Sequence, residues 1–274
     1  MKLRLYDAHN HLQDGRFNGR QGDLVEACRQ AGVTRMVVNG TCEGDWPQVL
    51  ELARAHPEVL PSFGYHPWYL AGRTPRWREN LIRFLDQIPA GVGEIGLDRW
   101  KPGLPYDGQE EAFCVQLRLA AERNLPVSSH CLQTWGRMLE LLQTGPRPAC
   151  GFLLHSYGGP QEMVRMFVEL GAYFSLPGYY AHERKERQRE TFRHMPLERL
   201  LLETDAPDQL LPAGRGRSLT DVTTAQPINH PVNLTGVYQF AAELRGLPLA
   251  ELAGQIEENF LRLFGRARGA RIEK

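Results

Sequence analysis

The sequence alternates short apolar segments with amphipathic segments along its whole length, and this alternation limits the folds that the chain can adopt. Between the apolar segments lie stretches with helical periodicity, such as 22–32, 107–124 and 159–171. Strand–helix alternation indicates parallel β-sheet, and eight units in 274 residues predict a closed TIM-type (β/α)8 barrel. We expect one domain over residues 1–274. The predicted strands are 3–9, 35–41, 59–66, 91–97, 125–131, 150–156, 172–178 and 200–206.

Composition excludes several other classes of protein. Apolar residues make up 42% and charged residues 23% of the chain, as in a folded globular protein. Because 32 acidic and 32 basic residues balance, no overall field attracts nucleic acid or a membrane, and any phosphate must be held locally. Five scattered cysteines argue against a disulfide framework or a zinc ribbon. With neither a signal peptide nor a membrane-spanning run, we expect a cytoplasmic protein without an obligate protein partner.

Histidines and acids gather at the ends of the predicted strands. Barrel enzymes carry their chemistry at the carboxyl ends of the strands. Five of the nine histidines lie at such positions, together with two acidic residues. Their spacing includes one His-x-His pair, whose rings share one face of an extended chain. The residues at strand ends are His9, His11, His66, Glu94, His130, His155 and Asp205.

Each of these residues alone has an ordinary structural explanation. A histidine at a strand end can be a hydrogen-bonded surface residue, Glu94 could pair with a buried arginine, and Asp205 could cap the turn after its strand. Several imidazoles and two carboxylates converging without partners would, however, be costly to remove from water. A divalent cation offsets that cost, so the combined pattern predicts a metal site.

Several segments together resemble the TatD-related metal-dependent hydrolases of the amidohydrolase superfamily. The resemblance covers nearly the whole chain, and the order and spacing of the segments make it specific. It implies a barrel with a two-metal site and the hydrolysis of phosphodiester bonds, in several members of DNA. The segments are DAHNHL, GYHPW, GEIGLD, LPVSSHC, LLHSYGG, LGAYFS, LLLETDAP, NHPVNL and ENFLRLFG.

The resemblance assigns roles to individual residues. His9, His11 and Asp205 would hold the first cation, and His130 and His155 the second, with Glu94 bridging both. A histidine corresponding to His66 lies near the substrate phosphate in the family. The ligand set suits Zn, Mn, Fe or Ni and does not exclude Mg. Asp205 and Glu94 would be the catalytic residues, with Asp205 accepting the proton of the attacking water.

Four further residues could support the site. Asp7 and Glu203 each precede a proposed ligand by two residues, so they could orient ligand imidazoles or form interior salt bridges. Residues 206–230 show no clear periodicity and follow the last strand, which predicts an active-site wall or lid. Arg215 and Arg217 in that segment could bind substrate phosphate, or could be solvated loop charges.

Three functions remain open at the level of sequence. The family resemblance favours hydrolysis of phosphodiester bonds in DNA, from an end or on single strands. The same metal centre could instead hydrolyse a small carboxylic amide, ester or lactone, because fold and metal site do not determine the substrate. A barrel retained as a binding or scaffold protein is disfavoured because every expected ligand is present.

Overall fold

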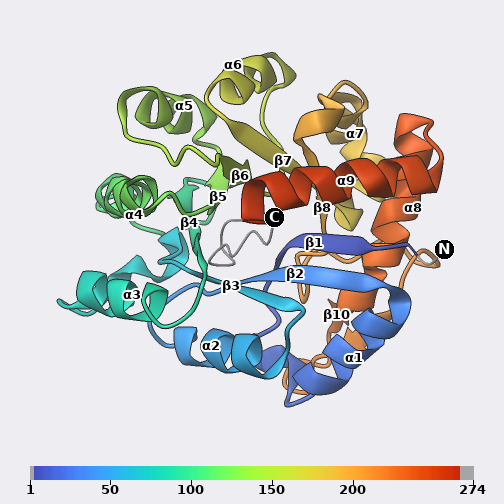
Figure 1. The fold of residues 1–274 in the computed structure, drawn as a ribbon, viewed down its shortest axis with the longest axis horizontal. Coiled ribbons are helices and arrows are strands. Elements are labelled where there is room, and N and C mark those ends of the chain that lie inside the picture. Colours follow the sequence, from blue (N-terminus) through green and yellow to red (C-terminus); the bar gives the residue numbers. More distant parts are fainter. Residues whose placement is uncertain (1–2, 266–274) are drawn as a thin grey trace, which may run out of the picture.

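Eight parallel strands form a barrel at the centre of the molecule (Figure 1). The computed structural model describes residues 3–265, so residues 1–2 and 266–274 of the predicted domain lie outside the described residues. Each strand pairs with the next in sequence order, as predicted. The strands are β1 (Leu5–Asn10), β2 (Val33–Asn39), β3 (Val59–Phe63), β4 (Gly91–Asp98), β5 (Val127–Leu132), β6 (Phe152–Leu154), β7 (Ala172–Pro177) and β8 (Leu200–Glu203).

Helices surround the barrel, and the predicted ones agree with the structure within a few residues. Gly32 ends α1 with a φ of 99°, a left-handed conformation that glycine adopts without strain. The predicted helix at 159–171 is instead a short 3-10 turn followed by α6. The helices are α1 (Gln21–Ala31), α2 (Trp46–Ala55), α3 (Trp77–Leu85), α4 (Gln109–Arg123), α5 (Trp135–Thr144), α6 (Val164–Glu169), α7 (Glu186–Arg193), α8 (Leu234–Arg245) and α9 (Leu249–Phe264).

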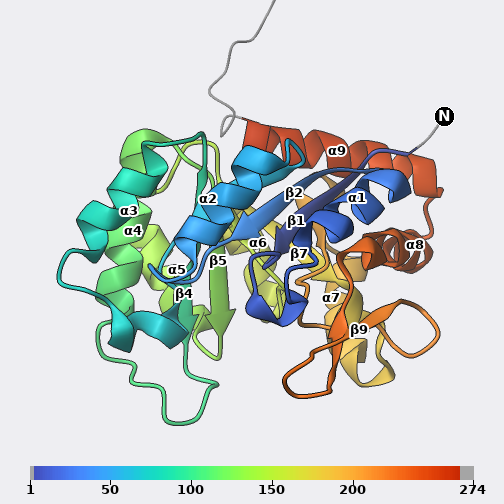
Figure 2. The ribbon, with the colours of Figure 1, turned by 90° about the horizontal axis from the view of Figure 1, so that it is seen from below.

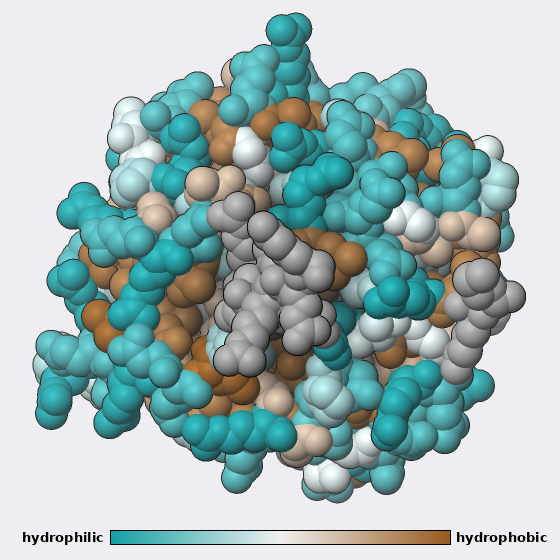
Figure 3. All heavy atoms as spheres, in the orientation of Figure 1, coloured by the Kyte–Doolittle hydropathy of each residue, from teal (hydrophilic) through white to brown (hydrophobic). Residues whose placement is uncertain are grey.

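Helix α9 shows how the periodicity of the sequence becomes packing. Leu252, Ile256, Phe260 and Leu263 recur at intervals of three or four residues, so they share one face of the helix, and all four are buried. In Figure 1 this helix crosses the near side of the molecule, over β1 and β8. The outer ring of that face is mainly hydrophilic (Figure 3). Within residues 3–265, no helix is long and apolar enough to cross a membrane.

The barrel closes where β1 meets the end of β8. The Asp205 N–H donates to the carbonyl oxygen of His9 at 3.0 Å, and the His11 N–H donates to that of Ala206 at 2.8 Å. These two bonds join the first strand to the end of the last one, so the sheet has no open edge at this place. Closure therefore brings three predicted metal ligands, distant in sequence, to adjacent backbone positions.

The segment 206–230 contains more regular structure than its sequence suggests. Two short antiparallel strands, β9 (Ser218–Thr220) and β10 (Pro227–Asn229), form a hairpin within it. The Asn233 amide nitrogen donates to the Arg217 carbonyl at 2.6 Å, and its oxygen accepts from the Arg217 N–H at 2.7 Å. Figure 2 shows β9 and the loop between β4 and α4 extending beyond the barrel at the same end, opposite α9.

Three of the predicted strands end before the site residue that they were expected to contain. Strand β3 stops three residues before His66, β6 stops one residue before His155, and β8 stops two residues before Asp205. The backbone turns at these points, and the His66 side chain accepts a hydrogen bond from the Trp68 N–H at the start of a 3-10 turn. These residues therefore lie in the loops just beyond the strands.

Substitution of Gly96 on β4 tests how closely the strands of the barrel pack beside the site. A Cβ atom at this position would lie 2.0 Å from the carbonyl oxygen of His130 on β5. We expect Gly96→Ala to separate the two strands and lower the free energy of unfolding by about 3 kcal/mol or more. Gly254→Ala is the matched control, because Gly254 lies in α9 with open space around it. That change should raise stability by up to about 1 kcal/mol. Urea denaturation compares the two, and equal stabilities would contradict this account of the packing.

Candidate metal centre

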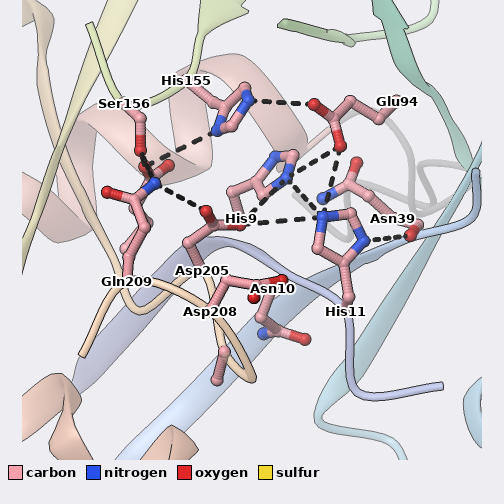
Figure 4. A network of polar contacts seen from close by, with 12 residues as sticks. His9, Asn10, His11, Asn39, Glu94, His155, Ser156, Asp205, Asp208 and Gln209 are labelled. Atoms are coloured by element: carbon pink, nitrogen blue, oxygen red, sulfur yellow. Dashed lines mark hydrogen bonds and ion pairs between the residues drawn. The ribbon is translucent and has the colours of Figure 1, made fainter. Parts of the chain in front are cut away.

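The six side chains predicted to bind metal converge at the carboxyl ends of the barrel strands, and Figure 4 labels five of them, all except His130. They come from the first, middle and last strands of the barrel or from the loops directly after them. Five of the six are buried. His11 is the exception, with 14% of its side chain exposed. The six are His9 in β1, His11 after it, Glu94 in β4, His130 in β5, His155 after β6 and Asp205 after β8.

One group of donor atoms lies where β1, β4 and the end of β8 meet. The Nε2 atoms of His9 and His11 are 3.3 Å apart, and Glu94 Oε2 lies 3.4 and 3.2 Å from them. Asp205 Oδ1 lies 3.7 Å from His9 Nε2 and 3.6 Å from His11 Nε2. Four atoms about 3.4 Å apart can share a centre about 2.1 Å away, the bond length of zinc to nitrogen and carboxylate oxygen. These residues therefore fit one divalent cation.

A second group surrounds the other oxygen of the same carboxylate. Glu94 Oε1 lies 2.9 Å from His155 Nε2, 3.2 Å from His130 Nδ1 and 3.3 Å from His66 Nε2. His155 Nε2 and His130 Nδ1 are 3.4 Å apart. Because each oxygen of Glu94 faces its own set of imidazole nitrogens, the donor atoms fit two cations bridged by one carboxylate.

In the rings of His11 and His130, the nitrogen that faces away from Glu94 is hydrogen-bonded to an acceptor. When either ring is neutral, the nitrogen that faces Glu94 therefore carries a lone pair. His11 Nδ1 lies 2.8 Å from the Asn39 carbonyl, which only accepts, so the proton of a neutral ring sits on Nδ1. His130 Nε2 lies 2.8 Å from Asp98 Oδ2, which places that ring's proton on Nε2. The nitrogens turned toward Glu94 are then unprotonated, as a metal ligand requires.

His66 has the opposite arrangement. Its Nδ1 accepts a hydrogen bond from the Trp68 backbone N–H at 3.1 Å, so the proton of the neutral ring must sit on Nε2. Burial, with the charge of His130 as a smaller contribution, lowers the pKa of His66 to about 4, and the ring is neutral at pH 7. The Nε2–H group therefore points at Glu94 Oε1 as a donor, and the ring cannot act as a ligand through that atom.

The charges in this cluster depend on one another. Burial alone would raise the pKa of Glu94, but the imidazoles of His66, His155 and His9 hold it well below its usual value. Burial lowers the pKa of an imidazole, yet the hydrogen bond and charge of Glu94 raise that of His11 to about 9. In the absence of cations, protons on imidazoles balance the buried carboxylate.

The carboxylate of Asp205 is held by the loop that follows it (Figure 4). Its Oδ2 accepts a hydrogen bond from the Gln209 amide at 2.6 Å, while Oδ1 faces His9 and His11. The same amide also donates to the Ser156 hydroxyl, which donates to Glu203. Burial raises the pKa of Asp205 to about 7. A carboxylate of this basicity can accept a proton near neutral pH.

Comparison with known proteins identifies the family. The family model described as TatD related DNase matches residues 6–265. The chain belongs to this family. It is 33% identical to the 3'-5' ssDNA/RNA exonuclease TatD of Escherichia fergusonii, covering 95% of this chain and 99% of that protein. It is 31% identical to the uncharacterized metal-dependent hydrolase YjjV of Escherichia coli K12, covering 96% of this chain and 99% of that one. The crystal structure of YjjV, a TatD homolog, superposes with a TM-score of 0.87 at 29% identity, covering 97% and 99% of the two chains.

In this chain of the TatD family, the acidic residue that lies nearest to a proposed ligand imidazole, Asp98, was not predicted from the sequence. Asp98 Oδ2 lies 2.8 Å from His130 Nε2 and accepts from the Trp68 indole N–H at 2.7 Å. Because alternate residues of a strand share a face, its position four residues after Glu94 on β4 was the available signal.

Two predicted supporting residues behave differently from each other. Glu203 Oε1 lies 3.7 Å from His155 Nδ1, so it faces a ligand imidazole as one alternative proposed. Asp7 contacts no imidazole ring and, within residues 3–265, no cationic side chain. It accepts from the Thr204 N–H at 3.0 Å and the Thr204 hydroxyl at 2.6 Å, so both predictions for Asp7 were wrong. Its carboxylate joins β1 to the end of β8.

The two loop arginines lie apart from the metal ligands. Both are exposed, and the Arg215 guanidinium pairs with Glu243 on α8 at 3.3 Å. The backbone of Arg217 is held by Asn233. Burial, followed by the charges of Arg217 and Arg20, lowers the pKa of His230 to about 4. Unlike the six ligands, neither arginine is brought into the centre.

Cation binding to this TatD centre should strengthen as pH rises. The pKa of His11 is raised to about 9 in the cation-free protein, so its proton must be displaced at pH 7. From about pH 6.5 to 8.5 we expect the apparent Kd for Zn²⁺ to fall about tenfold per pH unit for each displaced proton. Competition against a chelator at several pH values measures this. Saturation should occur at two cations per chain, and a pH-independent Kd would contradict the assignment of His11.

Proposed function

We propose that the protein hydrolyses phosphodiester bonds in single-stranded DNA with two divalent cations. The observation that carries this proposal is the placement of Glu94, whose two oxygens face separate groups of imidazole nitrogens. A paired cation site of this kind suits displacement at phosphorus, because both the attacking and the leaving oxygen need stabilisation. Family membership makes the chain a metal-dependent hydrolase, and relatives named as ssDNA/RNA exonucleases support the substrate class.

The proposal divides the ligands between two cations. His9, His11 and Asp205 would hold one, and His130 and His155 the other, with Glu94 shared. The donor set is compatible with Zn, Mn, Fe or Ni and does not exclude Mg. When bound, such cations acidify a water molecule and neutralise charge on the scissile phosphate.

Two residues of the chain would then act on protons. Asp205, whose Oδ1 faces the centre, would accept the proton of the attacking water and pass it to the leaving oxygen. Gln209 keeps one oxygen of that carboxylate engaged, so the other faces the centre. His66 donates its Nε2–H to a phosphate oxygen, a role that its fixed tautomer supports.

A cytoplasmic location belongs to the same proposal and rests on the sequence, in which five scattered cysteines form no disulfide pattern.

The proposal is tested by a panel of substrates with the metal-reconstituted protein. Single-stranded oligonucleotides should be cleaved fastest, duplex DNA more slowly, and bis-p-nitrophenyl phosphate measurably. Carboxylic esters and lactones should not be cleaved. Faster cleavage of a lactone or ester than of any phosphodiester would favour the alternative hydrolase function.

Glu94→Gln should weaken both cation sites and lower turnover by at least about a hundredfold, because one substitution removes the charge shared by two cations. The matched control is Glu79→Gln on α3, where the side chain is 66% exposed and contacts only Arg76 among the ion pairs of residues 3–265. Elemental analysis, circular dichroism and the rate of phosphodiester cleavage are compared. Loss of only one cation in Glu94→Gln would show that the carboxylate does not bridge.

Arg215 and Arg217 are proposed to position a phosphate next to the scissile one. Their segment leaves the barrel at Asp205, and both arginines are exposed, so their guanidinium groups can reach a phosphate. Replacing both with alanine should raise the KM for an oligonucleotide several-fold without changing the cation content. Arg215 pairs with Glu243, so Glu243→Gln frees the Arg215 side chain without removing it. Comparing this variant with the double variant shows whether breaking the ion pair or losing the arginine changes KM. An unchanged KM in the double variant would assign both arginines to the solvated surface.

A further inference from the structure

Two large aromatic side chains are exposed at the end of the barrel that carries the metal ligands. Trp100, on the loop after β4, is 55% exposed, and Tyr69, on the loop after β3, is 45% exposed. Tryptophan is highly buried on average, and tyrosine and tryptophan are enriched at binding surfaces. All five tryptophans lie within residues 3–265, and Trp100 is the only one of them that is exposed. Figure 2 shows its loop extending outward past the strand ends.

Both aromatic residues are connected to the metal centre through short contacts. The Tyr69 ring centre lies 6.0 Å from that of His66, whose Nε2 is 3.3 Å from Glu94. The backbone of Trp100 is held through Asp98, which contacts His130 with Oδ2 and accepts from the Trp100 backbone N–H with Oδ1 at 2.6 Å. The loops that carry Tyr69 and Trp100 are therefore both attached to the metal centre, through His66 and through Asp98.

Arg99 and Lys101, the sequence neighbours of Trp100, lie over two other aromatic rings. The Lys101 ammonium lies 3.9 Å from the centre of the Trp68 ring, and the Arg99 guanidinium lies 4.0 Å from that of Tyr106. Within residues 3–265 neither cation takes part in an ion pair with a carboxylate. These two cations can therefore attract an anion locally, although the net charge of the chain is zero.

We infer that Tyr69 and Trp100 form a stacking surface for unpaired bases, with Lys101 meeting a phosphate of the same strand. We name these three residues the aromatic rim. Aromatic side chains interleaved with basic ones are how proteins bind single strands without reading their sequence. In a duplex the faces of the bases are stacked on one another, so the rim selects single-stranded nucleic acid. This inference rests on the proposed phosphodiester hydrolysis and adds a base-binding subsite to it.

Binding to matched strands separates stacking from phosphate contact. The probes are an oligothymidylate with phosphorothioate linkages, which resists cleavage, and an abasic phosphorothioate strand of the same length. Binding to the metal-loaded protein is followed by fluorescence anisotropy of the labelled strand. Trp100→Ala should raise the Kd for the thymidine strand about 5- to 100-fold and change the Kd for the abasic strand much less. Tyr69→Ala should act in the same direction, and Trp100→Phe should restore most of the affinity.

Control variants show whether the effect belongs to the aromatic rim. Ile82→Ala removes an exposed apolar side chain from α3 and should leave both Kd values unchanged. Oligothymidylate should also quench tryptophan fluorescence in the wild type, and Trp100→Ala should abolish most of that quenching. Circular dichroism and cation content verify that each variant is folded.

Three outcomes would overturn the inference. Equal weakening of both strands by Trp100→Ala would mean that Trp100 only holds its loop in place. Unchanged binding in both aromatic variants would mean that bases are held elsewhere. A concentration-dependent dimer in the wild type that is lost in Trp100→Ala would assign the rim to protein association. If the wild type binds oligothymidylate through Trp100 but cleaves no phosphodiester, the proposed function fails and the base-binding subsite stands.

Discussion

The carboxylate of Glu94 is buried in the middle of the barrel end, with imidazole nitrogens within 3.4 Å of both of its oxygens. A buried carboxylate costs several kcal/mol of solvation unless positive charge compensates it, on the order of the penalties known for single buried ions. In this molecule the compensation comes from imidazole protons, which is why the pKa of His11 and that of His155 are raised. Divalent cations would supply the same compensation and release those protons. Metal binding, proton release and the charge of the site are therefore coupled through one residue.

Closure of the barrel is the second requirement, because it brings ligands from the two ends of the chain together. The hydrogen bond from the Asp205 N–H to the His9 carbonyl links β1 to the end of β8. The Asp7 carboxylate reinforces that junction through Thr204. An open sheet with the same eight strands would keep Glu94, His130 and His155 near one another but separate His9 from Asp205. The first cation group depends on closure, whereas the second depends on neighbouring strands in the middle of the sheet.

Chemistry and substrate contact come from different parts of the fold. The ligands lie in strands or within a few residues of them, where hydrogen-bonded neighbours restrict their movement. The residues proposed to contact substrate lie on longer loops, with Trp100 after β4 and the arginines after β8. These loops vary without disturbing the barrel, which is how one metal centre serves different substrates. A net charge of zero fits this division, because only local groups such as Lys101 need to attract the phosphates.

By itself the sequence determined the order of the eight strands, and it identified Glu94 and the five histidines that gather around it. Both were predictable because strand periodicity is local and because parallel strands in a barrel end on the same side. It did not distinguish Asp98, which contacts a ligand imidazole, from Asp7, which does not. That distinction depends on register: β4 and β5 pair Gly96 with His130, which brings Asp98 beside the ring. The tautomer of His66 was also undetermined, because it depends on a backbone N–H two residues away in a turn whose geometry the fold sets. Only the tertiary structure decided these features, since a hydrogen bond between distant residues depends on distances and angles that no local pattern encodes.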